Sequence, residues 1–197
     1  KIKWQKKLIS KYDLFQKRTY YDEAARVPAI LSWPGVFPRG ERCDRVMSAL
    51  DLNATMLEAM CAPDLPGSQG RSALRLLKNP ATGNWEDLAF SEYIMLEGPA
   101  QRMVRMDKWK LIYHHEQPTQ LFDMREDPNE LHDRAGDPSC RTVIRDLTDR
   151  ALQGWNPGKM VTRLRESHQQ IGLIREWVSR IDPPSQFIWE RQRESNE

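Results

Sequence analysis

Residues 15–35 read FQKRTYYDEAARVPAILSWPG, and this stretch decides the fold that we expect of the chain. It opens on basic residues, passes through an aromatic and acidic turn, and continues into the apolar run of residues 27–33. Pro34 and Gly35 end that run, whose length and composition are typical of a buried strand. The stretch therefore predicts one strand of an α/β fold.

The segments that follow it read as helices and loops. Apolar residues at helical spacing predict a helix within residues 44–60, with Ser48 or Asp51 as its N-terminal cap. Residues 62–70 contain two prolines and two glycines and therefore predict a loop. Residues 72–77 predict a short helical turn.

Four short segments rich in tyrosine, isoleucine, valine and tryptophan predict a small antiparallel sheet. They are residues 87–95, 102–106, 108–114 and 121–123. The third segment alternates two sets of side chains, Trp109, Leu111 and Tyr113 with Lys110, Ile112 and His114. This alternation predicts a sheet with one solvated face. Two packed helices are expected to follow, within residues 141–155 and 159–180.

Composition limits the class of protein. A chain of 197 residues has room for one domain, or for one domain with an extension. Its 30 basic and 28 acidic residues are interspersed, so neither nucleic acid nor a membrane is an expected partner. No apolar run approaches the roughly 18 residues of a membrane span, and no signal peptide is visible, so a cytoplasmic or periplasmic location stays open. Three widely spaced cysteines predict free thiols.

Four blocks in series carry a resemblance to a known family. They are residues 15–35, residues 48–57 (SALDLNATML), residues 102–113 (RMVRMDKWKLIY) and residues 120–138 (QLFDMREDPNELHDRAGDP). In order and spacing they are similar to the C-terminal part of type I sulfatases, in the alkaline-phosphatase-like superfamily, although Ala54 stands where proline is usual. Beyond Trp155, the Trp-Asn-Pro step and the final helix resemble choline-sulfatase-like members.

The resemblance implies a sulfuric ester hydrolase. Members of the family cleave sulfate esters with a formylglycine hydrate, made from a Cys or Ser in a C-x-P-x-R motif, and with a bound calcium ion. Lys17 stands where the family places its second sulfate-binding lysine, so the resemblance assigns it a catalytic and substrate-binding role. A lysine ammonium is a compact charge that suits this role. The alternative is a solvated lysine in a basic N-terminal segment.

The remaining catalytic apparatus of the family has no counterpart in this chain. Cys61-Ala62-Pro63 repeats the first letters of C-x-P-x-R but lacks the arginine, so Cys61 is expected to be a loop or buried thiol. Asp13 stands alone where the family has a pair of metal residues. We therefore expect no cofactor in this chain, and calcium and formylglycine in a full-length parent. The chain alone is expected to be inactive.

Two histidines and three arginines are further candidates. His114 and His115 end a predicted strand, must face opposite sides, and are both weaker candidates for substrate binding. The alternative is a polar strand end. Arg102 and Arg105 are also expected on opposite faces, and Arg26 is expected to pair with Asp22 or Glu23. Residues 123–130 are acidic, but Arg125 occupies an expected ligand place and no glycine makes the sharp turn, so no calcium loop is predicted there.

We expect three parts: a remnant of the large α/β domain over residues 1–80, a small subdomain over 81–156, and a helical extension with a charged tail over 157–197. The full-length parent would act on a sulfate-ester small molecule or a sulfated glycan. One alternative is a phosphonate or phosphate ester hydrolase of the same superfamily. The other is a non-catalytic module that associates with another chain or with itself.

Overall fold

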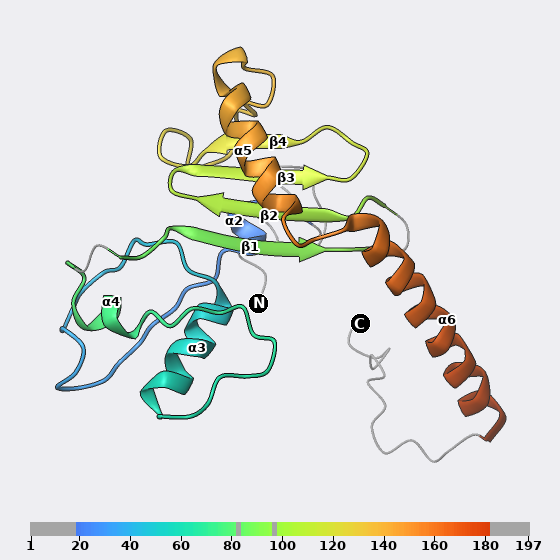
Figure 1. Ribbon diagram of the computed structural model, residues 1–197, viewed down its shortest axis with the longest axis horizontal. Coiled ribbons are helices and arrows are strands. Elements are labelled where there is room, and N and C mark those ends of the chain that lie inside the picture. The colour runs from blue at the N-terminus through green and yellow to red at the C-terminus, as the bar shows by residue number, and fades with distance from the viewer. Residues whose placement is uncertain (1–18, 82–83, 96–97, 182–197) are drawn as a thin grey trace, which may run out of the picture.

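The computed structural model describes residues 19–81, 84–95 and 98–181 (Figure 1). Its helices are α2 (Asp22–Ala25), α3 (Ala49–Ala59), α4 (Leu74–Lys78), the 3-10 turn η1 (Pro138–Cys140), α5 (Arg141–Leu152) and α6 (Pro157–Ile181). Its strands are β1 (Leu88–Tyr93), β2 (Gln101–Met106), β3 (Trp109–His114) and β4 (Gln120–Asp123). The mixed α/β class is thus confirmed, with helices on both sides of one sheet.

The four strands form an antiparallel meander in the order β1-β2-β3-β4. Strands β2 and β3 pair from Gln101 opposite His114 to Met106 opposite Trp109. The two residues between them make a tight hairpin in which Asp107 takes a left-handed backbone conformation, with φ of 48°. The predicted antiparallel sheet is therefore confirmed, strand by strand.

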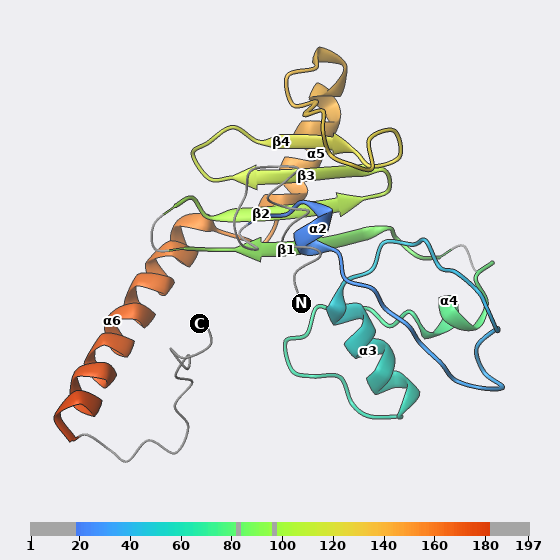
Figure 2. The same cartoon turned by 180° about the vertical axis from the view of Figure 1, so that it is seen from behind.

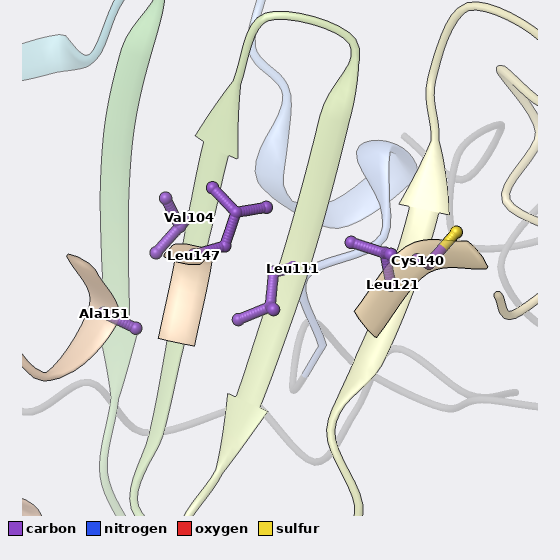
Figure 3. Close-up of a cluster of buried hydrophobic side chains, with 6 residues drawn as sticks. All are labelled: Val104, Leu111, Leu121, Cys140, Leu147 and Ala151. Atoms are coloured by element: carbon purple, nitrogen blue, oxygen red, sulfur yellow. The ribbon is translucent and has the colours of Figure 1, made fainter. Parts of the chain in front are cut away.

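Helix α5 covers one face of this sheet. Every second residue of the central strands points toward it, so that Val104, Leu111 and Leu121 pack against Leu147 and Ala151 of α5 (Figure 3). Cys140 of η1 closes the cluster at one end (Figure 3). This is the main core of the protein, and it fixes the orientation of the sheet beneath α5.

The opposite face of the sheet is also covered, so the prediction of one solvated face is wrong. Ile112 and Phe122 on this face are each 2% exposed and pack with Tyr20 and Met103. Figure 2 shows α2 lying in front of the sheet while α5 lies behind it. The sequence pattern did not reveal this cover because it comes from a segment about 90 residues earlier in the chain.

The predicted buried strand over residues 27–33 is not formed among the described residues. The segment has no regular secondary structure, and Val27 and Ile30 are 65% and 96% exposed. Within the described part of the chain, the backbone of residues 27–32 makes no hydrogen bond. A strand needs a neighbour that pairs with it, and no described strand lies along this segment.

Helix α3 begins as its sequence predicts. The Ser48 hydroxyl accepts a hydrogen bond from the Asp51 N–H at 3.2 Å, and the Asp51 carboxylate accepts one from the Ser48 N–H at 2.8 Å. This reciprocal capping box satisfies two N–H groups at the helix start. Asp51 also accepts a hydrogen bond from the Arg71 N–H, which ties the following loop to α3. A side chain at Gly70 would collide with the Leu50 carbonyl, so only glycine fits this approach.

Helix α6 extends away from the sheet in both views (Figures 1 and 2). Its first two turns are partly covered, and residues 165–181 are exposed. None of the helices in the described part of the chain has the length and apolar character that crossing a bilayer requires.

Candidate functional site

The segment that follows Lys17 is attached to the sheet through Tyr20 and Tyr21. Lys17 itself lies outside the described residues. Tyr20 is 5% exposed, and its hydroxyl donates to the Gln101 carbonyl oxygen at 3.2 Å. The ring of Tyr21 lies 5.8 Å from that of Phe122. Burial raises the pKa of the Tyr20 phenol, so this hydroxyl stays protonated and remains a donor.

A buried ion cluster holds α2 against the same face. The Lys110 ammonium donates to Asp22 at 2.6 Å and to Glu130 at 2.7 Å, and the Asp22 N–H donates to Glu130 at 2.6 Å. Lys110 and Glu130 are 1% and 3% exposed. Burial raises the pKa of the Glu130 carboxyl, and the neighbouring Lys110 opposes that rise. The cluster therefore joins residues 22, 110 and 130 into one anchoring point.

Sequence reasoning missed this cluster. Lys110 alternates with apolar residues, and that pattern is typical of a strand with one solvated face, so it gave no sign of a buried ion cluster. The expected pair of Arg26 with Asp22 is confirmed, but at 3.7 Å and with Arg26 72% exposed it is the weaker contact. The available signal for the cluster was one lysine, Lys110, within an otherwise apolar strand, together with the acidic residues Asp22 and Glu130 elsewhere in the sequence. It could not be read without knowing which face α2 covers.

His114 reaches the anchored segment through one side chain. Its Nε2 lies 3.4 Å from the Gln120 amide oxygen, and the Gln120 amide nitrogen donates to the Tyr21 hydroxyl at 3.3 Å. The structure therefore links one sequence-predicted candidate to the segment just after Lys17. These hydrogen bonds show where His114 lies relative to the segment after Lys17. They do not show a contact with a substrate.

His115 lies apart from this arrangement, on the other side of the strand end. Its Nδ1 is 3.3 Å from the Tyr113 hydroxyl, and the Tyr113 ring packs edge-on against Trp155. The expectation that the two histidines face opposite sides agrees with these contacts. His115 is thus not brought together with His114 or with α2.

The two arginines of β2 are held within the protein, on opposite faces as predicted. Arg102 donates to the Ala151 carbonyl oxygen at 2.9 Å and stacks over Phe90 and Trp155. Arg105 donates to the carbonyl oxygens of residues 107 and 109 at the hairpin. Burial lowers the pKa of both guanidinium groups, which still stay charged at neutral pH.

A groove of about 850 Å³ opens beside the anchored segment. It is lined by residues 25–31, by the loop before α3 together with parts of α3 and α4, and by Met103, Arg105 and Lys110 of the sheet. Its lining is mixed, with apolar side chains beside arginines and acidic residues. The groove therefore places the exposed residues 27–31 on an open surface of mixed polarity.

The described residues do not fit the cofactors that the resemblance implies. No group of three or more His, Cys, Asp or Glu side chains in this part of the chain could hold a metal ion. Asp123, in the acidic turn, already accepts hydrogen bonds from Lys108 and from the N–H groups of residues 125 and 126. Cys61 is an exposed free thiol in the loop after α3, as expected. No step of catalysis is assigned to these side chains.

The sequence of the chain is similar to those of known sulfatases. The family model of N-sulphoglucosamine sulphohydrolase, C-terminal, matches residues 10–155. Arylsulfatase K of Gallus gallus is 31% identical over 134 residues, which cover 63% of this chain and 25% of the relative. Choline-sulfatase of Rhizobium meliloti (strain 1021) is 26% identical over 188 residues, which cover 87% of this chain and 33% of the relative.

A solved structure gives the same picture of the fold. A protein in complex with its substrate D-glucosamine-2-N,6-O-disulfate superposes with a TM-score of 0.60 at 21% identity, over 76% of this chain and 33% of that chain. At this identity the likeness concerns the fold alone. The chain spans about a quarter to a third of the length of the relatives it matches.

Proposed function

Since the chain belongs to the N-sulphoglucosamine sulphohydrolase C-terminal family and is the C-terminal portion of a sulfatase-like hydrolase, we propose that its complete protein hydrolyses sulfate esters. The proposed substrate is a sulfated glycan or a small sulfate ester. Calcium and a formylglycine nucleophile belong to this proposal as parts of the complete protein. The described residues contain no group of three or more His, Cys, Asp or Glu side chains that could hold the ion.

The anchoring of residues 20–22 is the observation that carries the proposal. Only Arg18 and Thr19 lie between Lys17 and Tyr20, so chain connectivity keeps the Cα atoms of Lys17 and Tyr20 within about 11 Å of each other. Tyr20, Asp22 and Lys110 together hold the end of that short tether on a rigid sheet. An ammonium group only a few residues from an anchored segment can be held in one position at the site with little loss of chain entropy on substrate binding.

We assign to Lys17 the role of contacting a non-bridging sulfate oxygen. Charge builds on the sulfate and leaving-group oxygens during transfer, and a fixed ammonium offsets it. His114, hydrogen-bonded through Gln120 to Tyr21, is the second candidate on this side of the sheet. His115 is a weaker candidate, because its contacts lie with Tyr113.

The exposed segment of residues 27–33 supports a division into parts. We propose that residues 1–80 belong to the large α/β domain of the complete protein, that 81–156 form the small subdomain, and that 157–197 form an extension. An apolar segment with Ile30 96% exposed, whose backbone pairs with no described residue, is unfavourable in water. A neighbouring strand of a larger sheet would satisfy both its side chains and its backbone.

The isolated chain offers a first test of this proposal. We expect the purified 197-residue chain to show no arylsulfatase turnover above that of its Lys17→Ala variant, because a single cation without nucleophile and metal supplies only a small part of the barrier reduction. Turnover that depends on Lys17 in the isolated chain would contradict the proposal. An in-frame C-x-P-x-R motif upstream in the gene would support it.

A further inference from the structure

The acidic turn of residues 123–130 ends on a side chain that contacts the segment just after Lys17. This residue, Glu130, is 3% exposed. Its Oε2 accepts a hydrogen bond from the Asp22 N–H at 2.6 Å, and its Oε1 accepts one from the Lys110 ammonium at 2.7 Å. One carboxylate therefore binds both the backbone of the first residue of α2 and the buried cation of the sheet.

Hydrogen bonds within the turn hold Glu130 in place. The N–H groups of residues 127 and 130 donate to the carbonyl oxygens of residues 123 and 127, at 2.7 and 3.0 Å. Just beyond Glu130, the His132 N–H donates to the Asp127 carboxylate at 2.8 Å. At the start of the turn, the Lys108 ammonium donates to the Asp123 carboxylate at 2.6 Å. The turn is thus a hydrogen-bonded unit that is fixed to the sheet.

The backbone of Glu130 lies in a strained conformation. Its φ is 54°, in the left-handed region that residues with a side chain rarely adopt. Such strain persists only where the surrounding structure holds it, and it is concentrated at functional sites. In this turn the strained residue is also the one whose carboxylate contacts α2, so the strain coincides with the contact.

We propose that Glu130 is a positioning residue of the sulfate site, because it fixes the start of α2 and thereby restricts where Lys17 can lie. This inference rests on the role proposed for Lys17. Four residues separate Lys17 from Asp22, so a fixed Asp22 backbone limits the reach of the lysine ammonium. Between them, Tyr20 and Tyr21 contact the sheet, and the Glu130 carboxylate holds the end of this segment.

A double-mutant cycle in the complete protein, with kcat/KM for a sulfate ester as the readout, tests this proposal. Glu130→Gln keeps the shape of the side chain but replaces one acceptor oxygen with an amide donor, which then faces either the Asp22 N–H or the Lys110 ammonium. We expect it to lower kcat/KM by about tenfold to a hundredfold when Lys17 is present. In the Lys17→Ala background, the same substitution is expected to change kcat/KM by less than about twofold.

Glu126→Gln, in the same turn, is the matched control. The Glu126 side chain is 69% exposed and lies 3.5 Å from Arg134, so this variant is expected to stay within about twofold of its parent in both backgrounds. A second variant, Asp127→Ala, removes the acceptor of the His132 N–H and leaves the Glu130 carboxylate in the protein. It is expected to lower kcat/KM by a smaller factor than Glu130→Gln, again only when Lys17 is present.

The outcomes of the cycle separate this inference from the proposed function. If Glu130→Gln and Asp127→Ala lower kcat/KM by the same factor in both backgrounds, as general misfolding would, the positioning role is overturned and the role of Lys17 stands. The same holds if neither variant lowers kcat/KM. If Lys17→Ala leaves kcat/KM unchanged, the proposed function is contradicted, and the positioning role with it.

Discussion

The ammonium of Lys110 lies beneath α2 with a carboxylate on either side, at 2.6 Å from Asp22 and 2.7 Å from Glu130. It is the largest of the fully buried side chains among the described residues. A buried charge is tolerated only when partners surround it, and here both partners come from other segments. The same contact therefore sets both the stability of the sheet face and the position of the segment that follows Lys17.

Replacing Lys110 with methionine tests this point. The variant leaves two facing carboxylates without a cation in a buried site, and we expect a loss of about 3–5 kcal/mol in the free energy of unfolding. Urea denaturation measures it. Arg42→Met removes a cation from an exposed pair with Asp44 and should not move the urea midpoint. A Lys110→Met variant as stable as the wild type would contradict the assigned role of the cluster.

Glu130 gives the cluster a pH dependence of known sign. Burial raises the pKa of its carboxyl in the folded protein, so the folded state holds this proton more tightly than the unfolded state. Its stabilising contribution is present below the pKa of an unfolded glutamate, about 4.3, and is lost as the pH rises through the raised value. Urea denaturation above about pH 4 should therefore show Glu130→Gln gaining stability relative to the wild type as pH rises. Glu58→Gln, at an exposed helix position, should show no such trend.

The start of α3 shows an element that its own sequence determines. Ser48 and Asp51 form a reciprocal cap, so Ser48→Ala removes a side-chain acceptor from the helix N-terminus. We expect a loss of about 1 kcal/mol in the free energy of unfolding, measured by urea denaturation. Ser68→Ala, in the loop after α3, serves as control because Ser68 caps no helix. An unchanged stability in Ser48→Ala would mean that α3 unfolds independently of the sheet.

Elements with a strong local signal were predictable, and those that depend on distant partners were not. The four strands, the cap of α3 and the long helix α6 follow from hydrophobic period and capping residues, which act within a few positions. The cover over Lys110 comes from α2, nearly 90 residues away, so the alternation in β3 wrongly indicated a solvated face. Residues 27–33 have the composition of a buried strand, but composition does not supply the neighbour that a strand requires.

The molecule as a whole consists of a well-packed sheet with α5 and two less enclosed parts. Residues 27–33 expose an apolar segment on one side, and α6 exposes another beyond the opposite end of the sheet (Figure 1). Family membership could be inferred from four short blocks, because their order and spacing are specific. The arrangement of these blocks in space, including the hydrogen bonds that link His114 through Gln120 to Tyr21, could be found only from the structure. Hydrogen bonds between distant segments produce no periodic pattern in a sequence.

The role assigned to Lys17 is tested by the rate at which the complete protein hydrolyses a sulfate ester, measured with and without this lysine. With the upstream part of the reading frame present, we expect Lys17→Ala to lower kcat/KM by about a hundredfold to a thousandfold, as loss of one charge-stabilising group does. Lys11→Ala, in the same basic segment, should stay within about twofold of the wild type. A Lys17→Ala enzyme with wild-type kcat/KM, or a complete protein that hydrolyses no sulfate ester, would contradict the account.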